Sequence, residues 1–544
     1  MTRELNADVV VVGGSLGGCA AALAACRLGA TVVMSEETPW FGGQLTSQTV
    51  PPDEHRYIET FGSSDAYREL RRRIRDYYRR NFPLTADARS ARWLNPGRHE
   101  CSSLACEPRA GLAALTEMLA PHVHSGRLRI LTAHEPVGAE TDADQIRSVR
   151  VRSRLSGELT DIAGRLFLDA TELGDLLELS GAEHVIGAEP QEETDEPSAI
   201  PGGNPRCQMC ITWCLQIDHV EGEDHTIARP AEYDFFRTTI PPHWPNPQLS
   251  FVALDYDTMG PWQHTFLPVV EDGPLWESLW THRRMIAADQ FAPGTYVSDI
   301  LHVNWTQNDY FWGPIVGVDE EERRHHLEMS RQLSLSLLYW LQTEAPRPDG
   351  GAGWPGLRLR GDVSGTEDGL AMYPYIREAR RIRAETTMLE QHISAQVRTD
   401  GAVRYPDAVG VGYYFLDMHQ RTEEAVPFLI QTWPFQIPLG SLIHSRVQNL
   451  LASCKNIGVT HVVNSATRLH PIEWVIGEAA GTTAAYCVAR GVEPAAVRAD
   501  EDTLADLQST LVRAGVEIEW PSLAPVRAWH EHLRYTVDPD GARL

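Results

Sequence analysis

The sequence of 544 residues contains almost no lysine. Of its 48 lysine and arginine residues, only Lys455 is a lysine. Because Schiff-base chemistry needs a lysine amine, that chemistry has a single candidate in this chain. The formal net charge is −26 at pH 7. Proteins bind nucleic acid through clustered cations, so this acidic balance argues against a nucleic-acid partner.

The sequence also lacks a convincing export signal or membrane span. The uncharged run 9–26 is interrupted by four glycines, and the residues before it carry no net positive charge. Nine cysteines are scattered along the chain. Their odd number fits a reduced protein better than a disulfide framework, so we expect a cytoplasmic protein with no membrane partner.

Residues 8–37 predict a nucleotide-binding unit: "DVVVVGGSLGGCAAALAACRLGATVVMSEE". A β-branched run indicates a buried strand, an alanine-rich stretch a helix, and "ATVVM" a second strand that leads to an acid. In such a unit, N–H groups at the helix start face a pyrophosphate, and the acid accepts the ribose hydroxyls. A serine stands at the second glycine position, where small size matters most. The predicted dinucleotide contacts are Gly13, Gly14, Ser15, Gly17, Gly18 and Glu36, and the alternative is a glycine-rich turn of another α/β protein.

A second glycine pair, Gly42-Gly43, follows Glu36 after five intervening residues, in "EETPWFGGQLTSQ". An acid followed by such a pair resembles the FAD-dependent oxidoreductases of the glutathione-reductase-like superfamily. The resemblance implies that the cofactor is FAD rather than NAD(P). It also implies that the segment beginning at Gln44 reaches along FAD toward the flavin.

Later segments resemble one bacterial branch of that superfamily, known simply as FAD-dependent oxidoreductases. The resemblance covers roughly residues 1–60, 125–190 and 370–495. "LFLDATEL" resembles a strand end beside FAD, with Glu172 where glycine is usual, and Cys454-Lys455 replaces the usual Gly-Arg. The branch pattern appears at 374–382, Asp417-x-His419, 437–442, 449–451 and a glycine-containing helix start at 477–481. The resemblance implies FAD contacts at Val137, Ala170, Thr171, Gly477, Glu478 and Ala480.

The composition changes between about residues 183 and 360, where proline, tryptophan and histidine accumulate. We predict an α/β fold, with a Rossmann-like FAD-binding domain of the glutathione-reductase type and an inserted α+β substrate or cap domain. A long amphipathic helix is expected at 320–345. The predicted parts are 1–182 (FAD-binding domain, first part), 183–360 (substrate or cap domain), 361–492 (completing the FAD site and substrate pocket) and 493–544 (C-terminal helical tail).

Three residues before the last long helix are candidate catalytic groups: His461, Arg468 and His470. The resemblance implies that this segment passes the flavin ring. A histidine there takes a proton as hydride leaves the substrate, and Arg468 holds an anionic substrate group or the charge of the reduced flavin. A purely structural role is an equal alternative for each histidine.

Two further clusters have both structural and functional interpretations. Cys207, Cys210 and Cys214 have the spacing of partial iron–sulfur or zinc ligands, but structural cysteines are favoured and no metal is predicted. The arginine-rich stretch 67–82 predicts an amphipathic helix with an apolar stripe at Tyr67, Leu70, Ile74 and Tyr77. For its seven arginines, a solvated face is favoured over an anion-binding or partner surface.

The sequence carries no second glycine-rich βαβ unit, so electrons enter the flavin most simply from the substrate. We predict an oxidase or dehydrogenase in which FAD accepts a hydride from a polar small molecule, such as an alcohol, amine or sugar. A single-component monooxygenase using NAD(P)H is the main alternative, followed by an electron-transfer subunit with a Cys-ligated iron–sulfur cluster. A redox-inert flavoprotein is a weaker alternative. Halogenation is disfavoured because the N-terminal half has no lysine, and homo-oligomerisation is left open.

Overall fold

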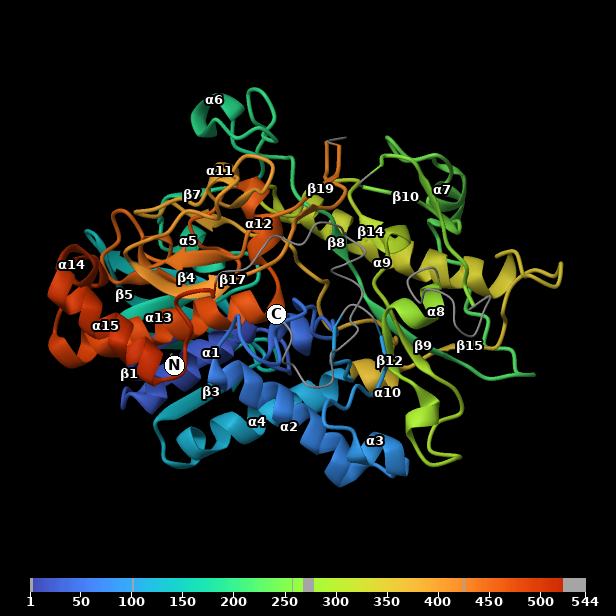
Figure 1. Cartoon of the computed structure of the whole chain (residues 1–544), viewed down its shortest axis with the longest axis horizontal. Helices are drawn as coiled ribbons and strands as arrows, with labels where there is room; N and C mark the ends of the chain where they lie inside the picture. The colour runs from blue at the N-terminus through green and yellow to red at the C-terminus, as the bar shows by residue number, and fades with distance from the viewer. Residues whose placement is uncertain (1–2, 100–101, 257, 268–277, 424–425, 522–544) are drawn as a thin grey trace.

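The computed structural model describes residues 3–99, 102–256, 258–267, 278–423 and 426–521 (Figure 1). Its largest sheet has seven strands in the order β3-β2-β1-β6-β5-β4, with β21 also paired to β6. β1, β2, β3, β6 and β21 pair in parallel, whereas β4 and β5 form an antiparallel extension. The α/β fold with a parallel sheet is therefore confirmed. The strands are β1 (Arg3–Val12), β2 (Val32–Glu36), β3 (Leu128–Thr132), β4 (His134–Asp142), β5 (Gln145–Ser153), β6 (Leu159–Asp169) and β21 (Leu450–Ala452).

Two helices rich in small residues lie against each other beside this sheet: α1 (Leu16–Arg27) and α13 (His470–Arg490) (Figure 1). A Cβ on Gly477 would lie 2.0 Å from the carbonyl oxygen of Gly17, so these backbones approach too closely for any larger residue. The expected helix start at 477–481 was wrong, because α13 begins at His470 and those glycines lie in its middle. Its end at Gly491, in the left-handed conformation, is as expected.

Helices α2 (Asp65–Asn81), α3 (Ala86–Ser90) and α4 (Pro108–His124) follow the first βαβ unit. The expected solvated arginine face on α2 holds only in part, because Arg71 and Arg75 are buried. Arg71 pairs with Glu54 at 2.8 Å and with Glu59 at 2.6 Å, and Arg75 pairs with Glu59 at 2.5 Å. These buried carboxylates offset the cost of removing the guanidinium groups from water. Tyr78, rather than the expected Tyr77, is the buried tyrosine at that end of the stripe.

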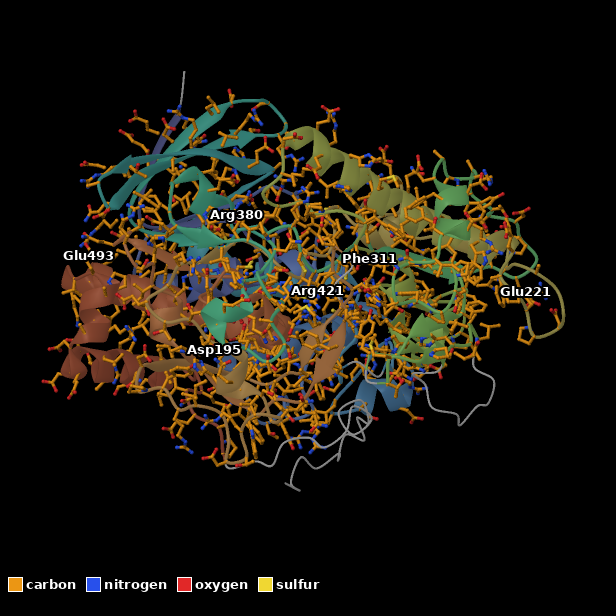
Figure 2. All side chains as sticks on the ribbon, turned by 90° about the horizontal axis from the view of Figure 1, so that it is seen from above. Asp195, Glu221, Phe311, Arg380, Arg421 and Glu493 are labelled. Atoms are coloured by element: carbon orange, nitrogen blue, oxygen red, sulfur yellow. The ribbon has the colours of Figure 1, made fainter. Side chains whose placement is uncertain are left out.

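Residues 183–360 supply most of a second hydrophobic core, which Leu173, Leu370 and Ile376 complete. They also form a four-stranded antiparallel sheet, β12-β13-β9-β15. The long helix expected at 320–345 is present as α9, with Leu337 and Trp340 in that core. Glu221 of this segment and Glu493, just after α13, lie at opposite ends of the molecule (Figure 2). The role of this segment as a substrate or cap domain, and the four boundaries, stay predictions. Its elements are β7 (His184–Val185), α6 (Gln191–Thr194), β8 (Ile211–Thr212), β9 (Leu215–His219), α7 (Tyr233–Thr238), β10 (Val252–Leu254), β11 (Pro261–Gln263), α8 (Leu279–His282), β12 (Arg284–Ile286), β13 (Ile300–Val303), β14 (Asp309–Tyr310), α9 (Glu320–Thr343) and β15 (Leu357–Leu359).

The last part of the chain returns to the large sheet through short strands and helices. β17 pairs with β20 and β18 with β19, both antiparallel. Helices α14 and α15 begin the predicted C-terminal tail, and its remainder, 522–544, lies outside the described residues. Within the part of the chain described, no helix is both long and apolar enough to cross a membrane. The remaining elements are α5 (Asp175–Leu179), α10 (Gly361–Ser364), β16 (Arg381–Ile382), α11 (Glu390–Ile393), β17 (Ala408–Gly412), β18 (Leu416–Met418), β19 (Phe428–Ile430), β20 (Phe435–Pro438), α12 (His461–Thr467), α14 (Pro494–Ala499) and α15 (Glu501–Arg513).

Candidate functional site

The turn between β1 and α1 is built so that backbone, not side chains, lines its surface. Gly13 has φ +99°, and a Cβ on it would lie 2.3 Å from the carbonyl oxygen of Ala170. Ser15 is the N-cap of α1, since its Oγ accepts the Gly18 N–H at 3.1 Å. The serine at the second glycine position therefore closes the helix start with its own hydroxyl.

Glu36, at the end of β2, is buried against this turn. One carboxylate oxygen accepts the Gly14 N–H at 3.0 Å, and the other accepts the Thr38 N–H at 2.8 Å. Burial raises the pKa of Glu36 to about 7, although the Thr38 and Gly14 hydrogen bonds act to lower it. A narrow cavity of about 20 Å³ lies here, lined among others by Gly13, Glu36, Ala170 and Thr171.

The second glycine pair joins the nucleotide turn to the rest of the molecule. Gly42 has φ +112°, and its N–H donates to the Gly14 carbonyl at 2.6 Å. Farther along, Gln48 Oε1 accepts the Ile376 N–H at 3.2 Å, and Thr49 Oγ1 accepts from Gln216 Nε2 at 2.7 Å. The segment after the glycine pair thus runs from the nucleotide turn into contact with the second half of the chain.

A larger cavity of about 230 Å³ lies where the 183–360 segment meets the C-terminal part. Its walls combine aromatic side chains, including Trp262 and Trp305, with buried charged groups. Such a mixture of apolar walls and a few convergent polar groups is typical of small-molecule sites. The charged groups in its wall include Asp309, Arg377, Asp417 and His419.

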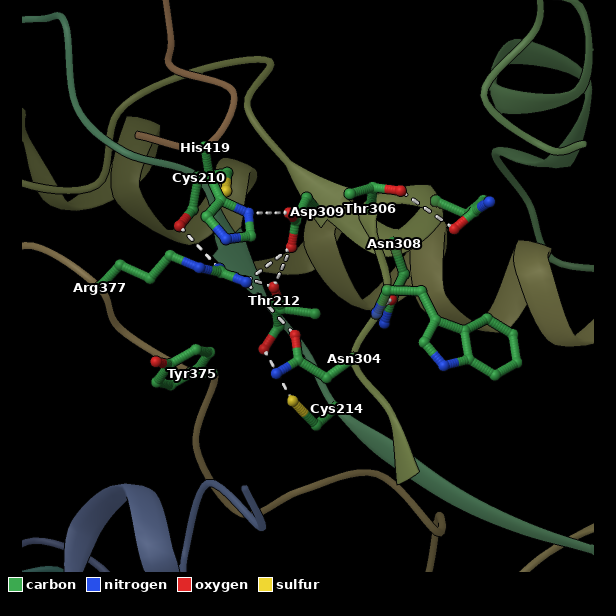
Figure 3. Close-up of polar contacts among 12 residues, drawn as sticks. Cys210, Thr212, Cys214, Asn304, Thr306, Asn308, Asp309, Tyr375, Arg377 and His419 are labelled. Carbon is green, nitrogen blue, oxygen red and sulfur yellow. Dashed lines mark hydrogen bonds and ion pairs between the residues drawn. The ribbon is translucent and has the colours of Figure 1, made fainter. Parts of the chain in front are cut away.

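His419 lies between two carboxylates at the wall of this cavity. Its Nδ1 is 2.8 Å from Asp309 Oδ2, and its Nε2 is 3.2 Å from Asp417 Oδ2. Each carboxylate also holds an arginine: Arg377 pairs with Asp309 at 2.9 Å, and Arg468 with Asp417 at 2.9 Å. The five side chains form one continuous network, part of which is drawn in Figure 3.

Short strands position this network. Asp309 begins β14, which pairs with β8 so that Asp309 faces Thr212, and Thr212 Oγ1 donates to Asp309 at 2.5 Å (Figure 3). Arg377 NH1 donates to the same Thr212 hydroxyl at 2.8 Å, and its guanidinium lies 4.7 Å from the centre of the Tyr375 ring. Four fixed partners leave the Arg377 guanidinium little freedom, so the Asp309 carboxylate has a fixed position.

The network favours a protonated His419. Burial alone lowers the pKa of His419, but the Asp417 and Asp309 carboxylates outweigh it, and the pKa lies well above 6.5. The effect is mutual, since burial acts to raise the pKa of Asp417 while His419 and Arg468 bring it to about 2. At neutral pH the imidazole is therefore a cation between two ionised acids.

Comparison with protein families decides the class of this molecule. The model of the family described as FAD dependent oxidoreductase matches residues 8–511. The chain belongs to that family. FAD is accordingly its cofactor, and the resemblance inferred from the sequence is confirmed. A comparison with curated proteins found no significant match.

Solved structures similar to this FAD-dependent oxidoreductase match only parts of it. The glycerol-3-phosphate dehydrogenase of Bacillus halodurans complexed with FAD is 14% identical, with 39% of this chain and 40% of that chain covered and a TM-score of 0.24. The rebeccamycin biosynthetic enzyme RebC is 14% identical over 40% of each chain, with a TM-score of 0.25. L-proline dehydrogenase from P. horikoshii is 14% identical over 35% of this chain and 25% of that one, with a TM-score of 0.18. The matches thus cover less than half of each of these chains, and similarities at such low TM-scores carry no argument.

The residues at the nucleotide turn fit FAD. The N-terminus of α1 faces the turn where a pyrophosphate would bind, although the Gly17 N–H is donated to Glu473 and the Gly18 N–H to Ser15. Glu36 lies in the same narrow cavity as Ala170 and Thr171. Val137 falls where the pairing of β4 with β5 shifts register between Pro136 and Gly138, so it has no place in the strand ladder. Contacts of individual residues with FAD stay predictions.

Three of the predicted FAD contacts lie on α13, away from that cavity. Gly477 packs against α1, and Ala480 is buried on the same helix. The Glu478 carboxylate accepts from Ser64 Oγ at 2.5 Å and from Trp474 Nε1 at 3.0 Å. In this structure these residues hold α13 against α1 and α2.

The three predicted catalytic residues occupy different surroundings. Arg468 belongs to the His419 network through Asp417. His470 accepts the Asp53 N–H at Nδ1 (3.1 Å) and contacts the Val50 carbonyl through Nε2 (3.2 Å), and burial lowers its pKa to about 4. His461 lies outside the cavity lining and pairs with Glu378 at 2.8 Å.

The three cysteines do not share one centre among the described residues. Cys210 lies with Asp309 and His419, whereas the Cys214 thiol contacts the Thr212 carbonyl at 3.7 Å (Figure 3). Cys207 interacts with His461. All three thiols are buried, and their structural role stays a prediction.

Sequence reasoning noted Asp417 and His419 as part of a pattern but did not give them a role. The Asp-x-His spacing was the available signal, because alternation along a strand places both side chains on one face. Asp309 gave no such signal. It reaches His419 only because β14 pairs with β8, a contact that sequence spacing does not encode.

Proposed function

We propose that this protein is an oxidase or dehydrogenase that removes a hydride and a proton from a polar small molecule bound in the 230 Å³ cavity. The observation that carries the proposal is the buried His419 network in the cavity wall. A buried histidine with a strongly shifted pKa in a cleft is a typical acid–base group. When bound, FAD supplies the hydride acceptor.

His419 is the group that takes the substrate proton. Its shorter bond, from Nδ1 to Asp309 at 2.8 Å, holds that nitrogen protonated. Nε2 has the longer 3.2 Å contact, to an Asp417 oxygen that Arg468 also occupies. Both carboxylates favour the imidazolium, so the neutral form of His419 is the minor form at neutral pH. In that neutral form Nε2 carries the lone pair and accepts the proton from a substrate hydroxyl or amine.

Arg377 and Arg468 act by positioning. Arg377 holds Asp309, and Arg468 holds Asp417, so both neighbours of the imidazole stay ionised and fixed. The cavity wall also includes Asp53, Asp255 and Arg283. Within the five-residue network, the two arginines and the protonated His419 give three cations against two carboxylates. This balance stabilises negative charge that develops on a substrate oxygen as its proton leaves.

The main alternative is a single-component monooxygenase that takes electrons from NAD(P)H. A second dinucleotide unit of the Rossmann type needs a parallel sheet of its own. The named parallel strand pairs of the described residues all belong to one sheet, which supports the absence of a dedicated NAD(P)H domain there. A single-component monooxygenase can bind NADPH without such a domain, so the assay below decides between the two reactions.

Oxygen uptake distinguishes the two reactions. The FAD-loaded protein is mixed with a panel of alcohols, amines and sugars, with and without NADPH. Uptake that depends on a panel compound and not on NADPH supports an oxidase. Uptake that requires NADPH supports the monooxygenase, and bound iron and acid-labile sulfide would instead indicate the electron-transfer subunit.

A further inference from the structure

The only lysine of the chain lies buried next to the nucleotide turn, in an ion cluster with two acids. Lys455 follows β21, and its side chain is fully buried. Its Nζ is 2.5 Å from Glu172 Oε2 and 3.4 Å from Glu473 Oε2. Among the residues described, Lys455 is the one cation paired with either carboxylate.

Both carboxylates lie where the pyrophosphate of a bound FAD would have to lie. Glu473 Oε1 accepts the Gly17 N–H at 3.0 Å, in the first turn of α1, where backbone N–H groups face phosphate oxygens. Glu172 Oε1 lies 2.3 Å from the point that a Cβ on Gly43 would take, and Ser15 Cα lies 3.0 Å from the same point. The Glu172 carboxylate thus fills the gap between the two glycine turns.

The charges of this cluster oppose an anionic ligand. One ammonium and two carboxylates are buried together, and a pyrophosphate adds further negative charge in the same place. Buried like charges without compensation are strongly destabilising, because neither water nor a counter-ion offsets their repulsion. One of the two acids therefore has to lose its charge or its position when FAD binds.

We propose that FAD binding transfers the Lys455 ammonium from Glu172 to the FAD pyrophosphate, and that Glu172 takes up a proton from solvent in the same event. Glu172 then occupies the site as a neutral acid. Lys455 stays beside Glu473. The pyrophosphate then lies next to the neutral acid Glu172 and the Lys455 ammonium.

Glu172 is the acid best placed to take the proton. Burial raises its pKa, and Lys455 is the cation that opposes the rise, so loss of that partner raises the pKa further. Glu473 keeps the Cys454 thiol and the Lys455 ammonium, and Lys455 lowers its pKa most although burial acts to raise it. The other titratable groups near Glu172 include Cys454, Glu36 and Tyr373, and their ionised forms would also be anions.

The experiment is a count of protons taken up during FAD binding. Calorimetric titration of FAD-free protein with FAD, in two buffers of different ionisation enthalpy, gives that number directly. We expect uptake that approaches one proton per FAD, and a dissociation constant that rises up to about tenfold per pH unit where Glu172 of the FAD-free protein is ionised. Wild-type binding without proton uptake overturns the proposal.

Variants test whether Glu172 takes up the proton and whether Lys455 supplies the cation for the pyrophosphate. Glu172→Gln should bind FAD without this proton uptake, and the pH dependence that remains is that of Glu36, whose pKa is about 7. Glu107→Gln removes another buried acid of raised pKa, outside this cluster, and should leave the uptake unchanged. With Glu172→Gln as background, Lys455→Met should weaken FAD binding at least about tenfold, whereas Lys455→Arg should retain it.

Uptake that survives Glu172→Gln contradicts the proposal, as does FAD binding that Lys455→Met leaves unchanged. Circular dichroism reports whether each variant is folded. If a variant fails to fold, the proton count of the wild-type protein decides alone. All these readouts measure FAD binding, so they stand apart from the reaction proposed for the cavity.

Discussion

Replacing His419 with glutamine removes the proposed proton acceptor and keeps a side chain that hydrogen-bonds. Asp309 retains Arg377 and Asp417 retains Arg468, so neither carboxylate is left without a cation and the fold should persist. General-base catalysis is worth about 10²–10⁴-fold, and we expect the rate of flavin reduction by substrate to fall by that factor.

The pH profile of the flavin reduction rate distinguishes a proton acceptor from a histidine with a purely structural role. Because the pKa of His419 lies well above 6.5, each pH unit below that pKa lowers the neutral fraction about tenfold. Wild-type flavin reduction should therefore rise with pH above neutrality, and His419→Gln should remove this slope.

The assay is anaerobic stopped-flow bleaching of the flavin with any compound that reduces the wild-type protein. His392→Gln is the matched control, because His392 bonds the Tyr405 hydroxyl at 2.9 Å outside the cavity lining. A His419→Gln protein that is folded, holds FAD and is reduced within about threefold of the wild-type rate would refute the assignment.

Three further predictions concern the cofactor turn and the fold. Ser15→Gly should keep FAD affinity within about tenfold, because glycine is tolerated at an N-cap, whereas Ser15→Val should abolish binding in an FAD titration. Arg71→Leu removes the 2.8 Å ion pair of Arg71 with the buried Glu54 and should lower the free energy of unfolding by about 3–5 kcal/mol in urea. The pKa of His461 is raised to about 9, since Glu378 outweighs burial. That pairing stabilises the fold fully below about pH 6.5 and loses its contribution, roughly 3 kcal/mol, as the pH rises to 9, so His461→Gln should flatten this fall in the melting temperature.

The nucleotide unit could be predicted from sequence because its signals are local. The strand that ends at Val12, the helix that follows it and the acid at position 36 lie within one short stretch, each with its own propensity or steric reason. The same holds for α9, whose periodicity is continuous, and for the end of α13, which Gly491 marks.

The candidate active site could not be assembled in this way. Asp309, Arg377 and His419 come from three distant segments, and their distances depend on strand pairing and on packing of the 183–360 segment. The burial of Arg71 could not be predicted from the sequence for a similar reason. Its partner acids precede the helix in the chain, so helical periodicity does not relate them to Arg71.

In the proposed reaction, electrons reach FAD from a substrate held in the cavity beside His419. Anaerobic addition of the alcohol, amine and sugar panel to the FAD-loaded protein, with NAD(P)H left out, tests it most directly. We expect at least one compound to bleach the flavin, and His419→Gln to slow this bleaching by about 10²–10⁴-fold. Bleaching by NAD(P)H alone, with no response to any compound of the panel, would contradict it.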